Sequence, residues 1–207
     1  MKSLVDNLEI KKVEFDEIDE VVKVEEEAWP LEIRAPREKF ESRMKIFSEG
    51  FLAAYVNGKM AAVSTSQIIR YPNPNLTSWE GITDNGLIAK SHDANGNALY
   101  VVSLGVSSRF QGKGLGSKLV EAQKKLAKRL ELGFLVLGAR VPGYHRHPHL
   151  PLERYIELKR DDGETLDPEI RFYERCGLKI VQVVPNYMED DPESLNYGAV
   201  MVWEDKS

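Results

Sequence analysis

Three glycines at alternating positions, with two lysines among them, occur in the segment RFQGKGLGSK, residues 109–118, close behind the apolar run NALYVVSLGV, residues 97–106. A glycine-rich turn between a buried strand and a helix lets backbone N–H groups gather around one point, where the helix adds the positive end of its dipole. Glycines let the backbone approach phosphate oxygens, and lysines add positive charge. The pattern favours an anion site over a purely structural turn, and its members are Gly112, Gly114, Gly116, Lys113 and Lys118.

Two common phosphate-binding motifs do not fit this spacing. A Walker A loop would place its first glycine at Ser107, and its lysine would be followed by serine or threonine, whereas Lys113 is followed by Gly114. A dinucleotide fingerprint, Gly-x-Gly-x-x-Gly, would need its last glycine at Ser117 or Leu119. The spacing therefore excludes both motifs.

The elements that must position this turn alternate between strands and helices, with no internal repeat and no linker between them. Alternating or continuous apolar runs predict strands, and apolar residues at three- and four-residue spacing predict helices. The expected strands are 8–15, 51–56, 59–69, 97–106, 134–139, 178–184 and 197–203. The expected helices are one capped by Asp16 and ended by Pro30, and others at 37–48, 115–130, 151–160 and 168–176.

Glycine and its neighbours set several of these boundaries. Asn57-Gly58 predicts a hairpin, because both central positions of a type I′ turn need positive φ. Gly133 and Gly177 are expected to end the helices that precede them. Residues 70–97 are rich in Pro, Asn, Gly, Ser and Asp, which indicates a long irregular segment with a function.

The composition excludes several classes of function. A net charge of −5 argues against nucleic acid as the main partner, because a phosphate-binding surface normally gives a basic excess. No apolar run approaches the roughly 20 residues that a membrane helix needs, and the N-terminus is too polar for a secretory signal. A single cysteine excludes an internal disulfide and favours a reducing, cytoplasmic setting. We expect one domain over residues 1–207.

The motif at residues 111–116, which reads QGKGLG, resembles the signature Gln/Arg-x-x-Gly-x-Gly/Ala of the GCN5-related N-acetyltransferase (GNAT) family. A second marker of that family is matched by FYERCGL, residues 172–178, with Leu178 in place of the usual aromatic residue. The order of expected elements is similar over nearly the whole chain. The resemblance implies an α+β GNAT fold, with helices on both faces of a mixed, mostly antiparallel sheet of about seven strands, in which strands 4 and 5 splay apart.

The second half of the chain carries a narrower resemblance. The segments GARVPGYHRH, LERYIELKRDDGETLDPEIRFYERCGL and VVPNYMEDDPESLNYGAVMVW look like the GNAT-like domain that is often fused to a carbon–nitrogen hydrolase. Since the chain ends at Ser207, we expect a stand-alone domain. Members of that group often lack the tyrosine of the late helix. This sequence has Tyr173, which favours genuine catalysis.

The resemblance implies transfer of an acetyl group from acetyl-CoA to a primary amine of a small molecule or peptide, through a ternary complex. In the family, the glycine turn holds the pyrophosphate and the splayed strand pairs with pantetheine. The residues that match these roles are Leu104, Val106, Gln111, Gly112, Lys113, Gly114, Leu115, Gly116 and Ser117. The alternatives are a regulatory module that binds acetyl-CoA or CoA without transfer, and an enzyme that uses the same turn for another phosphate ligand.

Acyl transfer needs three kinds of group, for which the sequence offers candidates. Negative charge develops on the thioester oxygen, and the backbone N–H of Val106 is the expected donor to it. Tyr173, carried over from the family motif, is the expected general acid for the leaving thiolate, since a tyrosine with a pKa of about 10 stays protonated at neutral pH. Glu26 and Glu27 are the candidate general bases, although an acidic run is usually a solvated face.

Other conspicuous residues favour simpler roles. His145, His147 and His149 stand two apart in a proline-containing loop, but no acidic or cysteine ligand accompanies them, so we expect no metal site. Cys176 is expected to be a small buried apolar residue. The residues expected to shape an acceptor pocket are Trp29, Trp79 and Tyr144. The last strand is expected to be an exposed edge that could support a homodimer.

Overall fold

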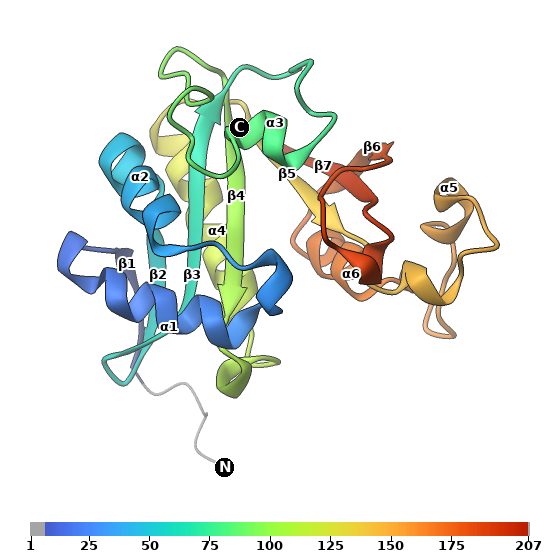
Figure 1. Cartoon of the computed structure of the whole chain (residues 1–207), viewed down its shortest axis with the longest axis horizontal. Helices are drawn as coiled ribbons and strands as arrows, with labels where there is room; N and C mark the ends of the chain where they lie inside the picture. The colour runs from blue at the N-terminus through green and yellow to red at the C-terminus, as the bar shows by residue number, and fades with distance from the viewer. Residues whose placement is uncertain (1–6, 207) are drawn as a thin grey trace.

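A computed structural model describes residues 7–206 of the chain and shows one mixed sheet of seven strands. The strands are β1 (Leu8–Lys12), β2 (Leu52–Val56), β3 (Lys59–Ile69), β4 (Ala98–Val106), β5 (Phe134–Arg140), β6 (Lys179–Val184) and β7 (Gly198–Glu204). Their order in the sheet is β1-β2-β3-β4-β5-β7-β6 (Figure 1). The expected α+β class and the expected strand count are confirmed.

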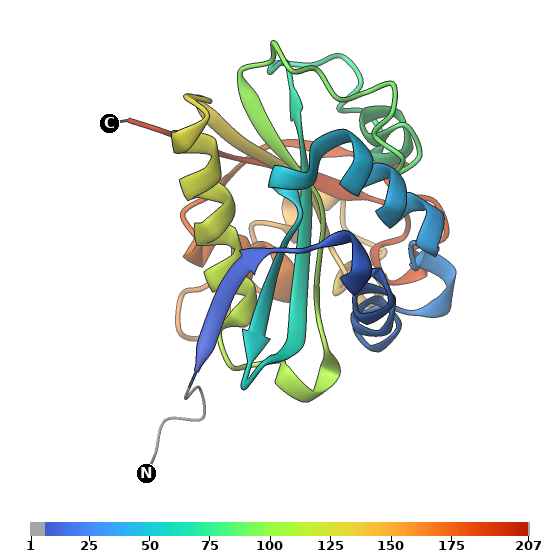
Figure 2. The same cartoon turned by 90° about the vertical axis from the view of Figure 1, so that its left-hand side faces the viewer.

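Six α-helices are described beside the sheet. They are α1 (Ile18–Ala28), α2 (Arg37–Phe47), α3 (Trp79–Thr83), α4 (Leu115–Arg129), α5 (Leu152–Tyr155) and α6 (Pro168–Arg175). Figure 2 shows α1 and α2 on one face of the sheet and α4 on the other, so helices cover both faces as expected. The apolar faces of α1 and α4 explain this placement, because each helix buries its stripe of Val, Ile, Leu and Ala residues against the strands.

The two central strands separate along their length. All other neighbouring strands are antiparallel, whereas β4 and β5 run parallel and pair over only three residues each, Ala98–Tyr100 with Phe134–Val136. Beyond Tyr100, β4 keeps its antiparallel partner β3 as far as Val106. The expected splay of strands 4 and 5 is therefore confirmed, and it opens the sheet at the end of β4 that leads into the glycine turn.

Several boundaries differ from the sequence prediction. Asp16 does not cap the first helix, because it lies inside a 3₁₀ turn, Phe15–Glu17, and α1 begins only at Ile18. The chain leaves α4 before Gly133, at Arg129, since Glu131 adopts a left-handed conformation with φ 56°. The helix expected at 151–160 ends at Tyr155, where the chain turns back and Lys159 forms a β-bridge with Thr165.

The last strand is not an edge of the sheet, which corrects the expectation of an exposed closing strand. β7 pairs with β5 on one side and with β6 on the other. The edge on this side is β6, and its Val181 side chain is exposed. The segment expected to be irregular at 70–97 also contains one regular element, the short helix α3. A homodimer stays a prediction.

Candidate active site

A cleft of about 540 Å³ opens where β4 and β5 separate, and it is called the main cleft below. Its walls come from the end of α1, the second half of β4, the glycine turn, the start of α4 and one face of α6. It is lined by Ala28, Trp29, Leu104, Gly105, Val106, Phe110, Gln111, Gly112, Gly114, Leu115, Gly116, Ser117, Pro142, Pro168, Glu169, Phe172, Tyr173 and Arg175.

The glycine turn needs glycine for its backbone conformation at two positions. Gly112 has φ 72° and Gly114 has φ 80°, a region that other residues enter at a cost. A Cβ added at either position would meet no atom within 4 Å, so the space beside them is open. α4 starts directly after Gly114, and its first intrahelical bond is donated by Lys118 N–H to the carbonyl of Gly114. The N–H groups before Lys118 are thus available to an anion in the cleft.

Gly116 has a different role from the two turn glycines. It lies in the first turn of α4, where an added Cβ would come within 3.0 Å of Phe172 Cζ on α6. The missing side chain lets α6 approach the start of α4 closely. Gly116 therefore permits the close packing of Phe172 against the start of α4, at one wall of the main cleft.

The two lysines of the turn do not line the main cleft. Lys113 Nζ donates a hydrogen bond to the carbonyl of Arg109 at 3.1 Å and lies 5.0 Å from the centre of the Phe110 ring. Lys118 lines a separate hollow between α4 and β1. Arg175 of α6 is the basic residue that does line the cleft, where it also forms an ion pair with Glu164.

The backbone of β4 presents polar groups to the gap beside β5. Ser107 N–H donates to the carbonyl of Ala61 on the β3 side, at 2.9 Å. Because backbone groups alternate along a strand, the N–H groups of Val106 and Leu104 point the other way, toward β5. The Val106 carbonyl, on the same side as its N–H, accepts from Gln111 Nε2 at 3.2 Å. The Val106 N–H therefore faces the region in which the sequence analysis expects an oxyanion.

A second, smaller cavity of about 60 Å³ lies on the α1 and α2 side of β4 and is called the inner cavity. Four residues line both the inner cavity and the main cleft, namely Trp29, Leu104, Glu169 and Tyr173. The two spaces thus meet at these side chains. Trp29 can lie across β4 because position 105 is glycine, where an added Cβ would come within 3.0 Å of the indole Nε1.

Tyr173 is buried on α6 at the junction of the two spaces. Burial raises the pKa of its hydroxyl well above the ordinary value of 10.0, so the side chain keeps its proton at neutral pH. The helix is fixed at both ends. Asp167 caps its start by accepting from Glu169 N–H and Ile170 N–H, and Gly177, with φ 81°, ends it as predicted.

Glu169 is the functional candidate that the sequence analysis did not identify. It lies one helical turn before Tyr173, and burial raises the pKa of its carboxyl from 4.5 to about 8, against the opposing charge of Arg140. Its Oε1 accepts from the backbone N–H of Arg140 at 3.2 Å. The four-residue spacing of Glu169 and Tyr173 was the available signal, because it places both side chains on one face of a helix.

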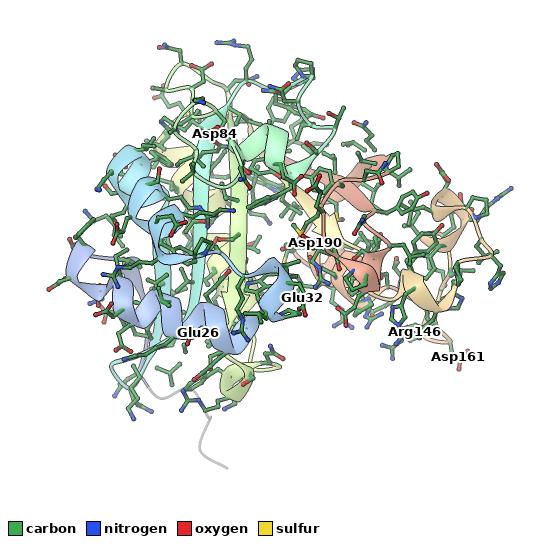
Figure 3. All side chains as sticks on the ribbon, viewed as in Figure 1. Glu26, Glu32, Asp84, Arg146, Asp161 and Asp190 are labelled. Carbon is green, nitrogen blue, oxygen red and sulfur yellow. The ribbon has the colours of Figure 1, made fainter. Side chains whose placement is uncertain are left out.

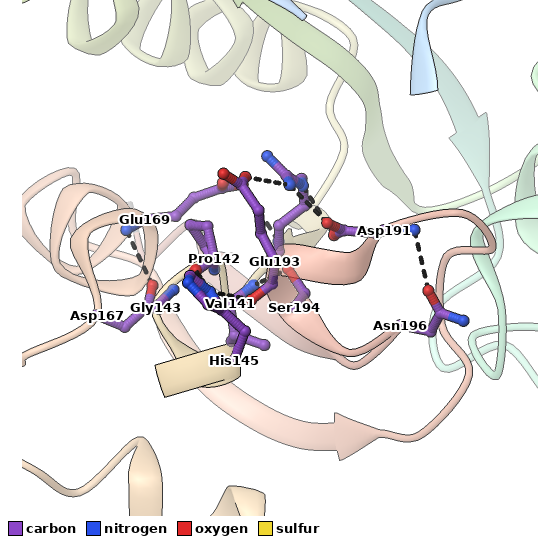
Figure 4. A network of polar contacts seen from close by, with 11 residues as sticks. Val141, Pro142, Gly143, His145, Asp167, Glu169, Asp191, Glu193, Ser194 and Asn196 are labelled. Atoms are coloured by element: carbon purple, nitrogen blue, oxygen red, sulfur yellow. Dashed lines mark hydrogen bonds and ion pairs between the residues drawn. The ribbon is translucent and has the colours of Figure 1, made fainter. Parts of the chain in front are cut away.

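A polar network holds the end of β5 against α6 (Figure 4). Arg140 forms two hydrogen bonds with the buried carboxylate of Asp191, at 2.8 and 2.6 Å, and one with Glu193 at 3.0 Å. Asp167 accepts from Gly143 N–H with one oxygen and caps α6 with the other. The network fixes the helix that carries Glu169 and Tyr173 relative to the splayed strands.

The two glutamates expected as general bases lie outside both spaces. Glu26 is exposed on α1 (Figure 3). Glu27 accepts from the hydroxyl of Ser107 and from Arg109, and these hydrogen bonds lower the pKa of its carboxyl. Glu27 therefore holds the start of the glycine turn against α1, and neither residue lines the cleft or the cavity.

The remaining candidates separate into lining and packing residues. Trp29 and Trp79 line the inner cavity, whereas Tyr144 is buried in the core between Tyr155 and Tyr197. Cys176 is a buried free thiol, as expected. Within residues 7–206, no group of three His, Cys, Asp or Glu side chains is arranged to hold a metal ion, and the three loop histidines form no such group.

Comparison with known proteins agrees with this architecture. The model of the Acetyltransferase (GNAT) family matches residues 16–148, and the chain belongs to that family. An uncharacterized N-acetyltransferase of Bacillus subtilis, YkwB, is 34% identical over 203 residues, which cover 95% of this chain and 88% of that protein. A probable hydrolase of the same organism, YhcX, is 28% identical over 94% of this chain but only 38% of its own length.

Solved structures show the same fold at low sequence identity. The loading GNATL domain of CurA from Lyngbya majuscula superimposes with a TM-score of 0.86 at 20% identity, covering 96% of this chain and 98% of that domain. The putative acetyltransferase yncA from Salmonella typhimurium, solved with acetyl-CoA, has a TM-score of 0.61 at 14% identity, covering 98% and 96%. The expected GNAT fold is confirmed. Among the helices of the described chain, none has the length and apolar character needed to cross a membrane.

Proposed function

We propose that this chain is an acetyl-CoA-dependent N-acetyltransferase that moves the acetyl group directly to a primary amine in a ternary complex. The observation that carries the proposal is the junction of the main cleft and the inner cavity at Tyr173 and Glu169, beside the splayed strands. Two ligands can reach these side chains from opposite sides. Direct transfer needs such an arrangement, because both reactants must be held near the reacting atoms at once.

The main cleft fits acetyl-CoA by the chemistry of its walls. The open side of Gly112 and Gly114 and the unbonded first turn of α4 suit a pyrophosphate, and the edge of β4 suits the amide groups of pantetheine. The residues proposed to hold it are Leu104, Val106, Gln111, Gly112, Gly114, Leu115, Gly116 and Ser117. Bound there, acetyl-CoA supplies the acetyl thioester. Lys113 contributes at most distant charge, since its ammonium group lies back on Arg109 and Phe110.

Three groups of the chain have proposed roles in the transfer itself. Glu169 accepts the proton that the attacking ammonium must lose, and its pKa of about 8 makes it a base suited to neutral or mildly alkaline pH. The Val106 N–H stabilises the negative charge that develops on the acetyl oxygen. Tyr173 gives its proton to the sulfur as the carbon–sulfur bond breaks, and its phenolate then takes the second proton, which the nitrogen loses as the carbon–nitrogen bond forms. The two protons lost by the nitrogen and the proton gained by the sulfur are thus all accounted for at the junction.

The relatives support this proposal. YkwB is named as an uncharacterized N-acetyltransferase, and the alignment covers 88% of its length. The structure of yncA was solved with acetyl-CoA as its cofactor. The single seven-stranded sheet, to which strands from both ends of the chain contribute, supports one domain over residues 1–207. The second candidate, a module that binds acetyl-CoA without transfer, has the same cleft but gives Glu169 and Tyr173 no role.

Two measurements on the full chain test the proposal. Acetyl-CoA and CoA should raise the melting temperature, whereas ATP and NAD should not, because a ligand that binds only the native state stabilises it by mass action. Acetyl-CoA with a panel of primary amines should then release CoA thiol and form the N-acetyl product. Stabilisation without turnover on any amine would favour the binding module, and no stabilisation by either CoA compound would contradict both candidates.

A further inference from the structure

The inner cavity contains two buried nitrogen donors that have no partner. Among the described residues, two buried side-chain polar atoms lack a hydrogen-bond partner, and they are Trp29 Nε1 and Arg43 Nη2. Both residues line the inner cavity. A buried donor without an acceptor is unfavourable, so two of them in one cavity beside a proposed reaction centre point to a ligand that carries acceptor atoms.

The charge of Arg43 is not neutralised by direct contact. Its side chain is 1% exposed, and it donates from Nε to the carbonyl of Gly86 at 2.7 Å and from Nη1 to the hydroxyls of Thr65 and Ser103. All three are neutral acceptors. Within residues 7–206 no carboxylate oxygen lies within 4.0 Å of this guanidinium. Burial accordingly lowers the pKa of Arg43 to about 10.

The second arginine of the cavity shows the contrast. Arg140 also lines the inner cavity, but its guanidinium is held by Asp191 and Glu193. Glu25 is the acid whose charge raises the pKa of Arg43, but it makes no hydrogen bond to the guanidinium. Its carboxylate accepts from the backbone N–H of Ala35 at 2.9 Å. Arg43 is therefore the cation of this cavity that has capacity for a further anion.

The two donors lie on different parts of the cavity wall. Arg43 donates from Nη1 to Ser103, which leaves Nη2 beside Gly86 and Trp79, and Trp29 Nε1 lies over Gly105, two residues further along β4. A carboxylate has two acceptor oxygens, one for each donor. The cavity of about 60 Å³ has room for a group of this size, since one water needs about 10–15 Å³ of such space.

We propose that the acceptor is an amino acid, whose carboxylate binds Arg43 Nη2 and Trp29 Nε1 in the inner cavity while its amine lies at the junction with the main cleft. This inference rests on the proposed function only in placing an acceptor there. An outer hollow shares Ile33, Ala35, Trp79 and Met188 with the inner cavity. Its charged residues are the acids Glu32, Glu80, Glu189 and Asp190 and the bases Arg34 and Lys39.

This excess of acids selects the probe. Two of the acids that line this hollow are Glu32, which follows α1, and Asp190, between β6 and β7. Both are labelled in Figure 3. A ligand with a cationic side chain beyond its carboxylate suits these charges. L-Arginine is such a ligand, L-argininamide replaces its carboxylate by a neutral amide of the same shape, and agmatine lacks the group altogether.

Calorimetric titration of the CoA-saturated full chain with these three ligands tests the proposal. L-Arginine should bind at least about tenfold more tightly than L-argininamide or agmatine, because a charge-assisted bond to a buried guanidinium is lost in both. Arg43→Gln should weaken binding of L-arginine by at least about tenfold and leave agmatine within about twofold. Trp29→Phe keeps an aromatic side chain but removes Nε1–H, and it should also weaken binding of L-arginine. This variant provides the test if Arg43→Gln does not fold.

Equal affinities for the three ligands, or no measurable binding of any, would overturn the carboxylate site. An equal loss for L-arginine and agmatine in a folded Arg43→Gln or Trp29→Phe variant would do the same. Release of CoA thiol from acetyl-CoA is measured separately. Carboxylate-dependent binding without turnover would support the site and contradict the transferase, and turnover with agmatine as efficient as with L-arginine would contradict the site and support the transferase.

Discussion

Glu169 and Tyr173 lie four residues apart on α6, and both side chains line the main cleft and the inner cavity at once. The helix is held by the Asp167 cap at its start and by the Arg140 network at the end of β5. Burial raises the pKa of both groups. The tyrosine therefore stays protonated at neutral pH, and the carboxyl of Glu169 has a pKa of about 8. One rigid helical turn thus presents a proton acceptor and a proton donor at the place where the two spaces meet.

Replacing Tyr173 by phenylalanine should lower kcat by about 10²-fold or more and leave the KM for acetyl-CoA nearly unchanged. The general acid acts in the transition state, and its loss typically costs about 10²–10⁴-fold. Steady-state kinetics with one good amine measures both constants. Tyr144→Phe is the matched control, because Tyr144 is also a buried tyrosine of this half of the molecule and lines neither space. Equal losses in the two variants would contradict the role of Tyr173.

Replacing Glu169 by glutamine should remove a pH-dependent step. In the wild type, kcat/KM should rise with pH through about 8, as the carboxyl loses its proton and becomes a base. Glu169→Gln should be slower above pH 7 and should lose this rise. Glu26→Gln, which changes an exposed glutamate of α1, should keep the wild-type profile. A profile that is unchanged in Glu169→Gln and altered in Glu26→Gln would assign the base to α1 instead.

The same Glu169 substitution should stabilise the protein at alkaline pH. A carboxyl with a pKa of about 8 in the folded state and 4.5 in the unfolded state favours folding only while it is protonated, so wild-type stability falls as the pH rises from 4.5 to 8. Glutamine stays neutral. The melting temperature of Glu169→Gln relative to wild type should therefore be higher at pH 8 than at pH 5, and 1 kcal/mol corresponds to about 2–4 °C. A constant difference would refute the raised pKa.

Local features of the fold could be predicted from the sequence. The glycine turn, the hairpin at Asn57-Gly58 and the end of α6 at Gly177 depend on backbone conformations that a few neighbouring residues decide, and the structure has positive φ at these positions. The helix expected at 151–160 ends at Tyr155 because a contact between residues further apart in the sequence decides the conformation beyond it. Its second half is held by a pairing of Lys159 with Thr165 across the turn at Gly163, which helical spacing does not indicate.

The proposed base, Glu169, is not among the candidates that the sequence offers. The position near the end of α1 favours Glu26 and Glu27. Helical periodicity from Val21 and Val24, however, places Glu25 on the inward face, and Glu25 is the buried acid of the three. Glu169 reaches the site because α6 packs beside the splayed strands, 63 residues after Val106 in the sequence. The four-residue spacing places Glu169 on the same helix face as Tyr173, but the packing of that face beside the splayed strands is a tertiary contact that no local pattern encodes.

Placing a carboxylate in the glycine turn should weaken binding of acetyl-CoA. Gly114→Glu puts a negative charge beside the first turn of α4, so the dissociation constant should rise at least tenfold, whereas the fold should survive because the space is open. The left-handed backbone itself costs about 1–2 kcal/mol for a side chain. Gly163→Glu is the matched control, since Gly163 has φ 81°, is equally open and lies outside the cleft. Equal affinities in the two variants would exclude the turn as the phosphate site.

The ion pair between Arg140 and Asp191 holds the end of β5, to which α6 is hydrogen-bonded through Glu169 and Asp167, and its loss should affect both stability and the site. Asp191 is fully buried, so Asp191→Asn leaves a guanidinium with only Glu193 as its charged partner and should cost about 3–5 kcal/mol in denaturant unfolding. Glu193 is half exposed, and Glu193→Gln should cost less than about 1 kcal/mol. Because the network also holds the end of β5 beside Glu169, Asp191→Asn should reduce kcat at temperatures where it is still folded. A loss of stability without any change in kcat would separate the network from the alignment of the site.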